Sequence, residues 1–117
     1  MPQFERPREV EGPLVTGFAG RLLKVDGTVR PGGVILTPVA ALDWNGDGFE
    51  AALNLDPLPE FILLGTGERL VRPSPAHLAP YEARDIGIEV MDTRAAARAW
   101  SLLRSEGRWI SAALRGL

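Results

Sequence analysis

The stretch of sequence that decides the fold runs from residue 61 to residue 109. It begins with FILLGTG (61–67), continues with GIEVMDT (87–93) and ends with RAAARAWSLLRSEGRW (94–109). The first two segments are short apolar runs that end in small polar residues, and a helical pattern follows the second. This order is typical of parallel strands joined by a crossover connection. The stretch therefore predicts an α/β protein.

The last helix is expected to begin at residue 94 and to end at Gly107, with Asp92 or Thr93 as its cap. One arc of this helix carries Ala95, Ala96, Ala99, Trp100, Leu102 and Leu103, and the other carries Arg94, Arg98, Ser101, Arg104 and Ser105. Ala99 and Leu103 lie near the middle of the apolar arc. We therefore expect both residues to face the sheet.

The rest of the chain predicts further strands around this unit. Residues 21–30 read as a hairpin, because Asp26-Gly27 supplies the positive φ angles of a two-residue turn. Residues 34–37 and 40–44 continue an antiparallel region, residues 49–55 form a weak helical segment, and residues 61–64 form a strand buried on both faces. Pro75 could start a helix that stops at Gly87, with Pro80 either kinking it or starting it late. Residues 109–114 read as a final strand.

Composition indicates one domain. The chain has 117 residues, 45% of them apolar, a net charge of −2 and no cysteine. This size can bury a core without disulfides, and the charge supplies no net field to attract nucleic acid. Residues 1–14 are expected to form a flexible tail and residues 15–117 a single α/β domain of three layers, with a central mixed sheet and a hairpin layer. No apolar run is long enough to span a membrane, and we expect a cytoplasmic protein.

A candidate ligand site lies where the two predicted parallel strands end. Gly65, Thr66 and Gly67 follow one strand, and Asp92, Thr93 and Arg94 follow the other. Open α/β sheets bind ligands at the carboxyl ends of their strands, and the amides of a Gly-rich turn can hold an anion. A tight turn and a helix cap explain the same residues without any ligand. No complete phosphate loop or dinucleotide fingerprint is present.

Other motifs point to ordinary structure. Asp43-Trp-Asn-Gly-Asp-Gly48 resembles the start of a calcium loop, but Asn54 stands where the bidentate glutamate belongs. No nucleophile or carboxylate stands at a spacing from His77 that would indicate a catalytic pair. The arginines of the last helix read as solvated charges, although they could pair with an acidic partner or phosphate. The sequence therefore predicts no catalytic residue, no metal site and no cofactor.

Several of these segments together resemble one known family. ILLGTG (62–67), GIEVMDT (87–93), AAA (95–97) and LRSEGR (103–108), with GFAG (17–20) and Trp44 upstream, are similar to a small α/β family of unknown function. Its mitochondrial member is an assembly factor of respiratory complex I, and the likeness covers the chain from about residue 15. The family usually has an asparagine at the position of Ser101 and a proline where this chain has Arg115-Gly116. The resemblance implies a three-layer α/β fold and no established catalytic residue.

Two functional hypotheses follow. The first is a non-enzymatic, bacterial-type interaction or assembly module that binds a protein partner, which is what the resemblance implies. The second is a small-molecule or anion binder, or an unrecognised enzyme, whose site lies at the six strand-end residues.

Overall fold

The computed structural model describes residues 11–46, 52–53, 55 and 58–117. Its elements, in chain order, are β1 (Val15–Ala19), β2 (Leu22–Val25), β3 (Thr28–Arg30), β4 (Gly33–Leu36), β5 (Ala41–Trp44), β6 (Phe61–Gly65), α1 (Pro75–Glu82), β7 (Gly87–Met91), α2 (Thr93–Ser105) and β8 (Ser111–Leu114). The weak helical segment expected over residues 49–55 lies largely outside the described residues, and the last strand begins two residues later than expected.

The strands form two sheets. β1, β2 and β3 make a three-stranded antiparallel sheet, and the second sheet has the order β5-β4-β8-β6-β7. In the second sheet β6 pairs in parallel with both β7 and β8, whereas β4 pairs antiparallel with β5 and β8. The α/β fold with a mixed central sheet and a separate hairpin layer, predicted from the sequence, is confirmed.

The central sheet is buried on both faces. Leu63 of β6 and Ala112 of β8 belong to a core that also holds Trp100 of α2 and Leu23 of β2. Their neighbours along the strands, among them Ile62 of β6, point into a second core with α1. Successive side chains of a strand point to opposite faces, so one continuous apolar run supplies both cores.

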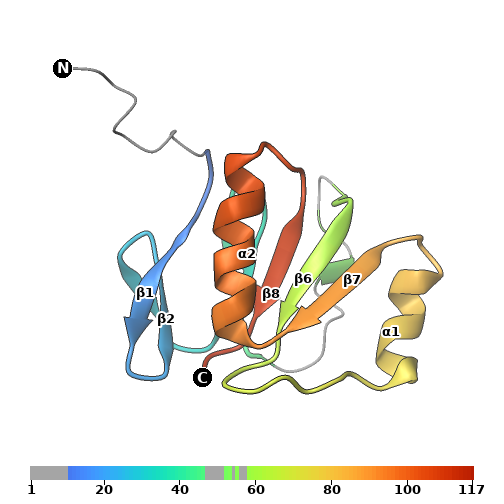
Figure 1. The fold of residues 1–117 in the computed structure, drawn as a ribbon, viewed down its shortest axis with the longest axis horizontal. Helices are drawn as coiled ribbons and strands as arrows, with labels where there is room; N and C mark the ends of the chain where they lie inside the picture. Colours follow the sequence, from blue (N-terminus) through green and yellow to red (C-terminus); the bar gives the residue numbers. More distant parts are fainter. Residues whose placement is uncertain (1–10, 47–51, 54, 56–57) are drawn as a thin grey trace.

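The layers follow from these two cores. α2 and the three-stranded sheet share the first core, and α1 belongs to the second. In Figure 1 the small sheet lies to the left of α2, and α1 lies at the opposite edge of the molecule, beyond β7. α2 is therefore the element that lies between the small sheet and the parallel strands.

The small sheet extends the predicted hairpin by one strand. Asp26 and Gly27 adopt φ angles of 50° and 82°, as the two-residue turn between β2 and β3 requires. β1 then pairs with β2, and its register shifts between Val15 and Gly17, which marks a β-bulge. Because the strand order is β1-β2-β3, β1 is an edge strand of this sheet.

α1 begins at Pro75 as expected, with Ser74 as its cap, and it contains Pro80. It ends well before Gly87, however. The amide of Ile86 donates to the carbonyl of Tyr81 at 2.9 Å, and Asp85 takes the left-handed conformation with a φ of 57°. Aspartate is one of the few residues other than glycine that tolerate this conformation, so the chain turns at Asp85.

α2 begins at Thr93, one residue earlier than expected, with one of the two expected caps, and it ends before Gly107 as expected. The side chain of Asp92 accepts a hydrogen bond from the amide of Ala95 at 2.9 Å, which makes Asp92 the N-cap. At the other end Gly107 has a φ of 78°, and the amide of Arg108 donates to the carbonyl of Leu103 at 3.0 Å. These are the bonds of a glycine-terminated helix.

The buried face of α2 differs from the predicted arc. Its buried residues are Thr93, Ala96, Ala97, Trp100 and Arg104. Leu102 was expected on the apolar arc and is 60% exposed, whereas Arg104 was expected on the polar arc and is 7% exposed. Buried Arg104 has backbone acceptors on both sides, because its Nη1 donates to the carbonyl of Arg108 and its Nη2 to the carbonyl of Glu11. Trp100, which was on the predicted arc, donates through Nε1 to the carbonyl of Pro13. Ala99 and Leu103 are partly buried and pack against the first core.

Candidate functional site

The two strand ends that the sequence proposed as a ligand site do lie side by side. β6 and β7 are paired in parallel with Gly65 opposite Met91, so the residues that follow each strand meet at one edge of the sheet. Thr66 donates its amide to the carbonyl of Met91 at 2.9 Å, and the amide of Thr93 donates to the carbonyl of Gly67 at 2.8 Å. The six residues are thus brought together, apart from the side chain of Arg94.

Thr93 is the centre of this strand-end cluster. Its side chain is fully buried. The hydroxyl accepts a hydrogen bond from the amide of Gly67 at 2.8 Å and donates one to the carbonyl of Arg115 at 2.8 Å. The amide of Arg115 in turn donates to the carbonyl of Gly65 at 3.0 Å. One hydroxyl therefore ties together the ends of β6, β8 and α2.

Thr66 closes the loop that leaves β6. Its hydroxyl donates to the carbonyl of Arg69 at 2.6 Å and accepts from the amide of Val71 at 3.0 Å. The residue is nearly fully buried. A threonine in this position shapes the following turn in the way that serine and threonine hydroxyls commonly do.

The glycines of the cluster are needed for space and conformation. A Cβ atom on Gly65 would lie 3.0 Å from Thr93 Oγ1 and 2.9 Å from a methyl of Leu114. Gly67 has a φ of 107°, which side-chain-bearing residues rarely adopt. Both features are explained by close packing of the strand ends. An anion at this position would compete with Thr93 for the amide of Gly67 and with Met91 for the amide of Thr66.

The side chain of Arg94 leaves this cluster and points to the small sheet. Its guanidinium lies 5.6 Å from the centre of the Phe18 ring, a distance at which a cation and an aromatic face attract. Phe18 belongs to β1 and is partly buried against the first core. Arg94 therefore belongs to a different surface from the other five residues.

That surface is an open groove of about 500 Å³ between β1 and α2. The β1–α2 groove is lined by residues 15–18 of β1 and by Arg94, Ala97, Arg98 and Ser101 of α2. The sequence placed Arg94, Arg98 and Ser101 on one polar arc, but it held no signal that β1 would lie beside them. The departure from the family pattern at Ser101 falls on this groove.

The lining of the groove carries positive charge. Among the described residues, Arg94 and Arg98 are its only charged members, and none is acidic. The ion pairs among the described residues are Arg21–Glu68, Arg30–Asp43 and Arg108–Glu60, so neither groove arginine takes part in one. Arg94 lies in the first turn of α2, where the positive end of the helix dipole also favours anions, and Arg98 lies one turn further along.

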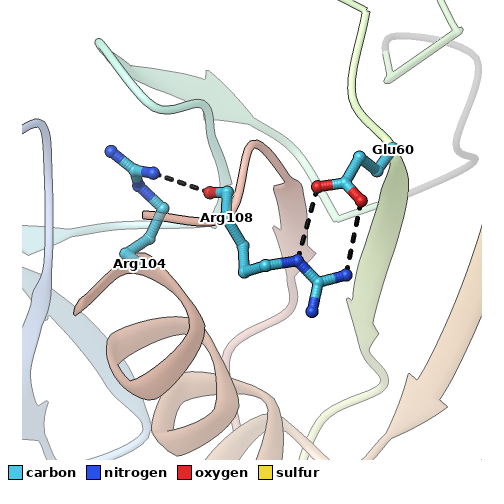
Figure 2. A network of polar contacts seen from close by, with 3 residues as sticks. All are labelled: Glu60, Arg104 and Arg108. Atoms are coloured by element: carbon cyan, nitrogen blue, oxygen red, sulfur yellow. Dashed lines mark hydrogen bonds and ion pairs between the residues drawn. The ribbon is translucent and has the colours of Figure 1, made fainter. Parts of the chain in front are cut away.

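A second group of arginines lies at the other end of α2 (Figure 2). Arg104 donates to the carbonyl of Arg108 at 2.7 Å, and Arg108 reaches the Glu60 carboxylate with its Nε and Nη2 atoms, each at 3.4 Å. The guanidinium of Arg104 also lies over the ring of Trp109. These contacts anchor the end of α2 to the chain before β6, so this group is structural.

The remaining motifs form no site within the described residues. His77 is exposed, and its amide donates to the carbonyl of Ser74 at the start of α1. Asp43 pairs with Arg30 at 2.8 Å, and most of the calcium-like loop after it lies outside the described residues. No group of three metal-ligating side chains is found in the part of the chain that is described. None of the helices described there is long and apolar enough to cross a bilayer.

Comparison with known proteins places this chain in a family. The model of the family described as proteins of unknown function (DUF498/DUF598) matches residues 15–115. The chain belongs to this family. A relative in cattle, named NADH dehydrogenase [ubiquinone] 1 alpha subcomplex assembly factor 3, is 31% identical over 89% of this chain and 62% of its own length. An uncharacterised protein of Rhodobacter capsulatus is 32% identical over 87% of this chain and 90% of its own length.

Solved structures of bacterial proteins share the fold of this chain. A crystal structure from Bordetella parapertussis superposes with a TM-score of 0.79 at 28% identity and covers 94% of this chain and 100% of that chain. An NMR structure from Xanthomonas campestris has a TM-score of 0.75 at 34% identity and covers 98% and 92% of the two chains. The resemblance expected from the sequence is confirmed, although the chain spans less than two thirds of the length of the bovine assembly factor.

Proposed function

We propose that this protein is a non-catalytic interaction module that assists the assembly of a multisubunit complex, with NADH dehydrogenase as the first complex to test. The observation that carries the proposal is the kinship with assembly factor 3, which extends over most of this chain. The cytoplasm is the proposed location, and cell fractionation would test it.

The arrangement of polar groups supports a binding role at the surface. At the strand ends, where an α/β enzyme would hold its ligand, Thr66 and Thr93 direct their hydroxyls to backbone groups of the same chain. The open β1–α2 groove, by contrast, is lined by Arg94 and Arg98, which take part in none of the ion pairs found among the described residues. Charged groups on an open surface contribute to partner selection and association rate.

Disruption of the gene in the host organism tests the assembly role. Membranes from the disrupted strain should lose NADH:ubiquinone oxidoreductase activity, and native gels should show partly assembled complex in its place. Succinate:ubiquinone oxidoreductase in the same membranes is the control, since a general membrane defect would lower both activities. Full NADH-dependent activity and an intact complex in the disrupted strain would contradict a role in this assembly.

The strand-end residues remain the place to test the competing hypothesis of an anion or small-molecule binder. Its support is geometric: Gly65, Thr66, Gly67, Asp92 and Thr93 converge at the amino end of α2. Binding there requires a ligand that displaces the hydroxyl of Thr93 from the amide of Gly67. Titration with inorganic phosphate, followed by the amide resonances of these residues, would detect such a ligand class.

A further inference from the structure

The β1–α2 groove follows the edge of a strand. Four consecutive residues of β1, from Val15 to Phe18, line it. The register shift between Val15 and Gly17 interrupts the usual alternation of side chains between the two faces of the strand, so consecutive residues of β1 line the groove. Among the described strands β1 is the outer one of its sheet, and an outer strand presents backbone N–H and C=O groups without a strand partner.

The two sides of the groove match in length. From residue 15 to residue 18 an extended chain covers about 10 Å, and from residue 94 to residue 101 a helix also covers about 10 Å. Two of the residues that line the groove from α2, Ala97 and Ser101, have small side chains. This leaves a channel with one strand edge and one cationic helix face.

The spacing of the two arginines matches a specific ligand pattern. Arg94 and Arg98 are four residues apart on α2, so they are separated by about 6 Å along the helix axis. Side chains at positions i and i+2 of an extended peptide point to the same side and are about 6.7 Å apart. Two carboxylates separated by one residue can therefore reach both guanidiniums at once, and guanidinium groups bind carboxylates through two hydrogen bonds.

We propose that the β1–α2 groove binds an extended acidic segment of a partner protein, which lies along the free edge of β1 and places two alternating carboxylates on Arg94 and Arg98. This assignment rests on the proposed interaction function and names the chemistry of the partner. The backbone edge of β1 provides affinity for an extended chain of any sequence, and the arginines select the acidic pattern.

A titration of the isotope-labelled protein with a short peptide tests the proposal. The probe is the acetylated, amidated peptide TVEVEVT, compared with TVQVQVT, which lacks the charges, and with TVEEVVT, which has adjacent carboxylates. TVEVEVT should shift the amide resonances of residues 15–18 and 94–101 in a saturable way and slow the hydrogen exchange of β1. TVQVQVT and TVEEVVT should bind several times more weakly.

Matched variants separate the groove from general charge effects. Arg98→Glu should weaken TVEVEVT binding by about three- to tenfold, and Arg98→Gln should give a smaller loss in the same direction. Arg72→Glu makes the same charge change on an exposed loop residue outside the groove, and it should leave the dissociation constant within about twofold. Circular dichroism of each variant confirms folding.

In the binding experiments, four results would overturn the proposal: no saturable binding of TVEVEVT, equal binding of TVEEVVT, equal losses for Arg98→Glu and Arg72→Glu, or binding of inorganic pyrophosphate at the arginines without peptide binding. The proposed function is judged separately. If Arg94→Glu/Arg98→Glu restores NADH dehydrogenase assembly in the disrupted strain as well as wild type does, the assembly role stands and the groove assignment fails.

Discussion

Replacement of Thr93 by valine tests whether the strand-end cluster is a structural element. Valine has nearly the same shape as threonine but no hydroxyl, so the change removes the bonds to the Gly67 amide and the Arg115 carbonyl, both 2.8 Å long. The residue is 0% exposed, and water cannot replace the hydroxyl without rearrangement. A buried hydrogen bond contributes about 0.5–1.5 kcal/mol, and a buried group left without a partner costs about 1–3 kcal/mol.

We therefore expect Thr93→Val to lower the free energy of unfolding by about 2–4 kcal/mol. Thr93→Ser is the matched control, because it keeps the hydroxyl and loses one methyl group, at a cost of about 1 kcal/mol. Urea unfolding followed by tryptophan fluorescence measures both changes, since Trp44 and Trp100 are buried. The slope of free energy against urea should stay constant across the three proteins.

The relative stability of Thr93→Val and Thr93→Ser shows whether the hydroxyl of Thr93 has a structural role. If Thr93→Val is as stable as Thr93→Ser, the hydroxyl does not hold the strand ends together. The internal hydrogen bonds would then be no obstacle to a ligand at this edge. If valine is the more damaging change, an anion that displaces this hydroxyl must first overcome the same cost.

Three further changes test other parts of the structure. Asp92→Ala removes the cap of α2 and should lower stability by about 0.5–2 kcal/mol in urea unfolding; unchanged stability with weakened phosphate binding would instead indicate a ligand role. Leu103→Ala should lower the free energy of unfolding by about 1–3 kcal/mol, which is less than for a fully buried leucine. Leu102→Ala, on the exposed side of α2, should change it by less than about 0.5 kcal/mol. Equal losses of stability in the two variants would contradict the orientation of the helix. Millimolar calcium should leave the melting temperature unchanged, because the twelfth ligand of the loop is missing; a saturable increase that Asp47→Ala abolishes would refute this.

Local chemistry made several elements predictable. The turn at Asp26-Gly27, the cap at Asp92 and the stop at Gly107 each depend on one or two residues whose preferences hold in any fold. The turn at Asp85 was missed because aspartate only tolerates the left-handed conformation, whereas glycine favours it. Prediction of these boundaries succeeds where a residue strongly prefers its conformation.

The candidate site was predictable only in part. That the ends of β6 and β7 meet follows from two apolar strands joined by a crossover, so the convergence of Thr66 and Thr93 could be expected. The hydrogen bonds from Thr93 to Gly67 and Arg115 could not, because they depend on the close approach of a third strand, β8. Tertiary packing therefore decides which polar groups at the strand ends already have hydrogen-bond partners within the chain and which can bind a ligand.

By itself the sequence determined that this is an α/β protein with parallel strands, since hydrophobic periodicity and turn residues act over short distances. Only the tertiary structure decided that Arg104 is buried and Leu102 exposed on α2. An acceptor for the Arg104 guanidinium is the carbonyl of Glu11, about 90 positions away along the chain. Tertiary structure also places β1 beside Arg98, where both line the same groove. No local pattern encodes a groove whose two walls come from opposite ends of the chain.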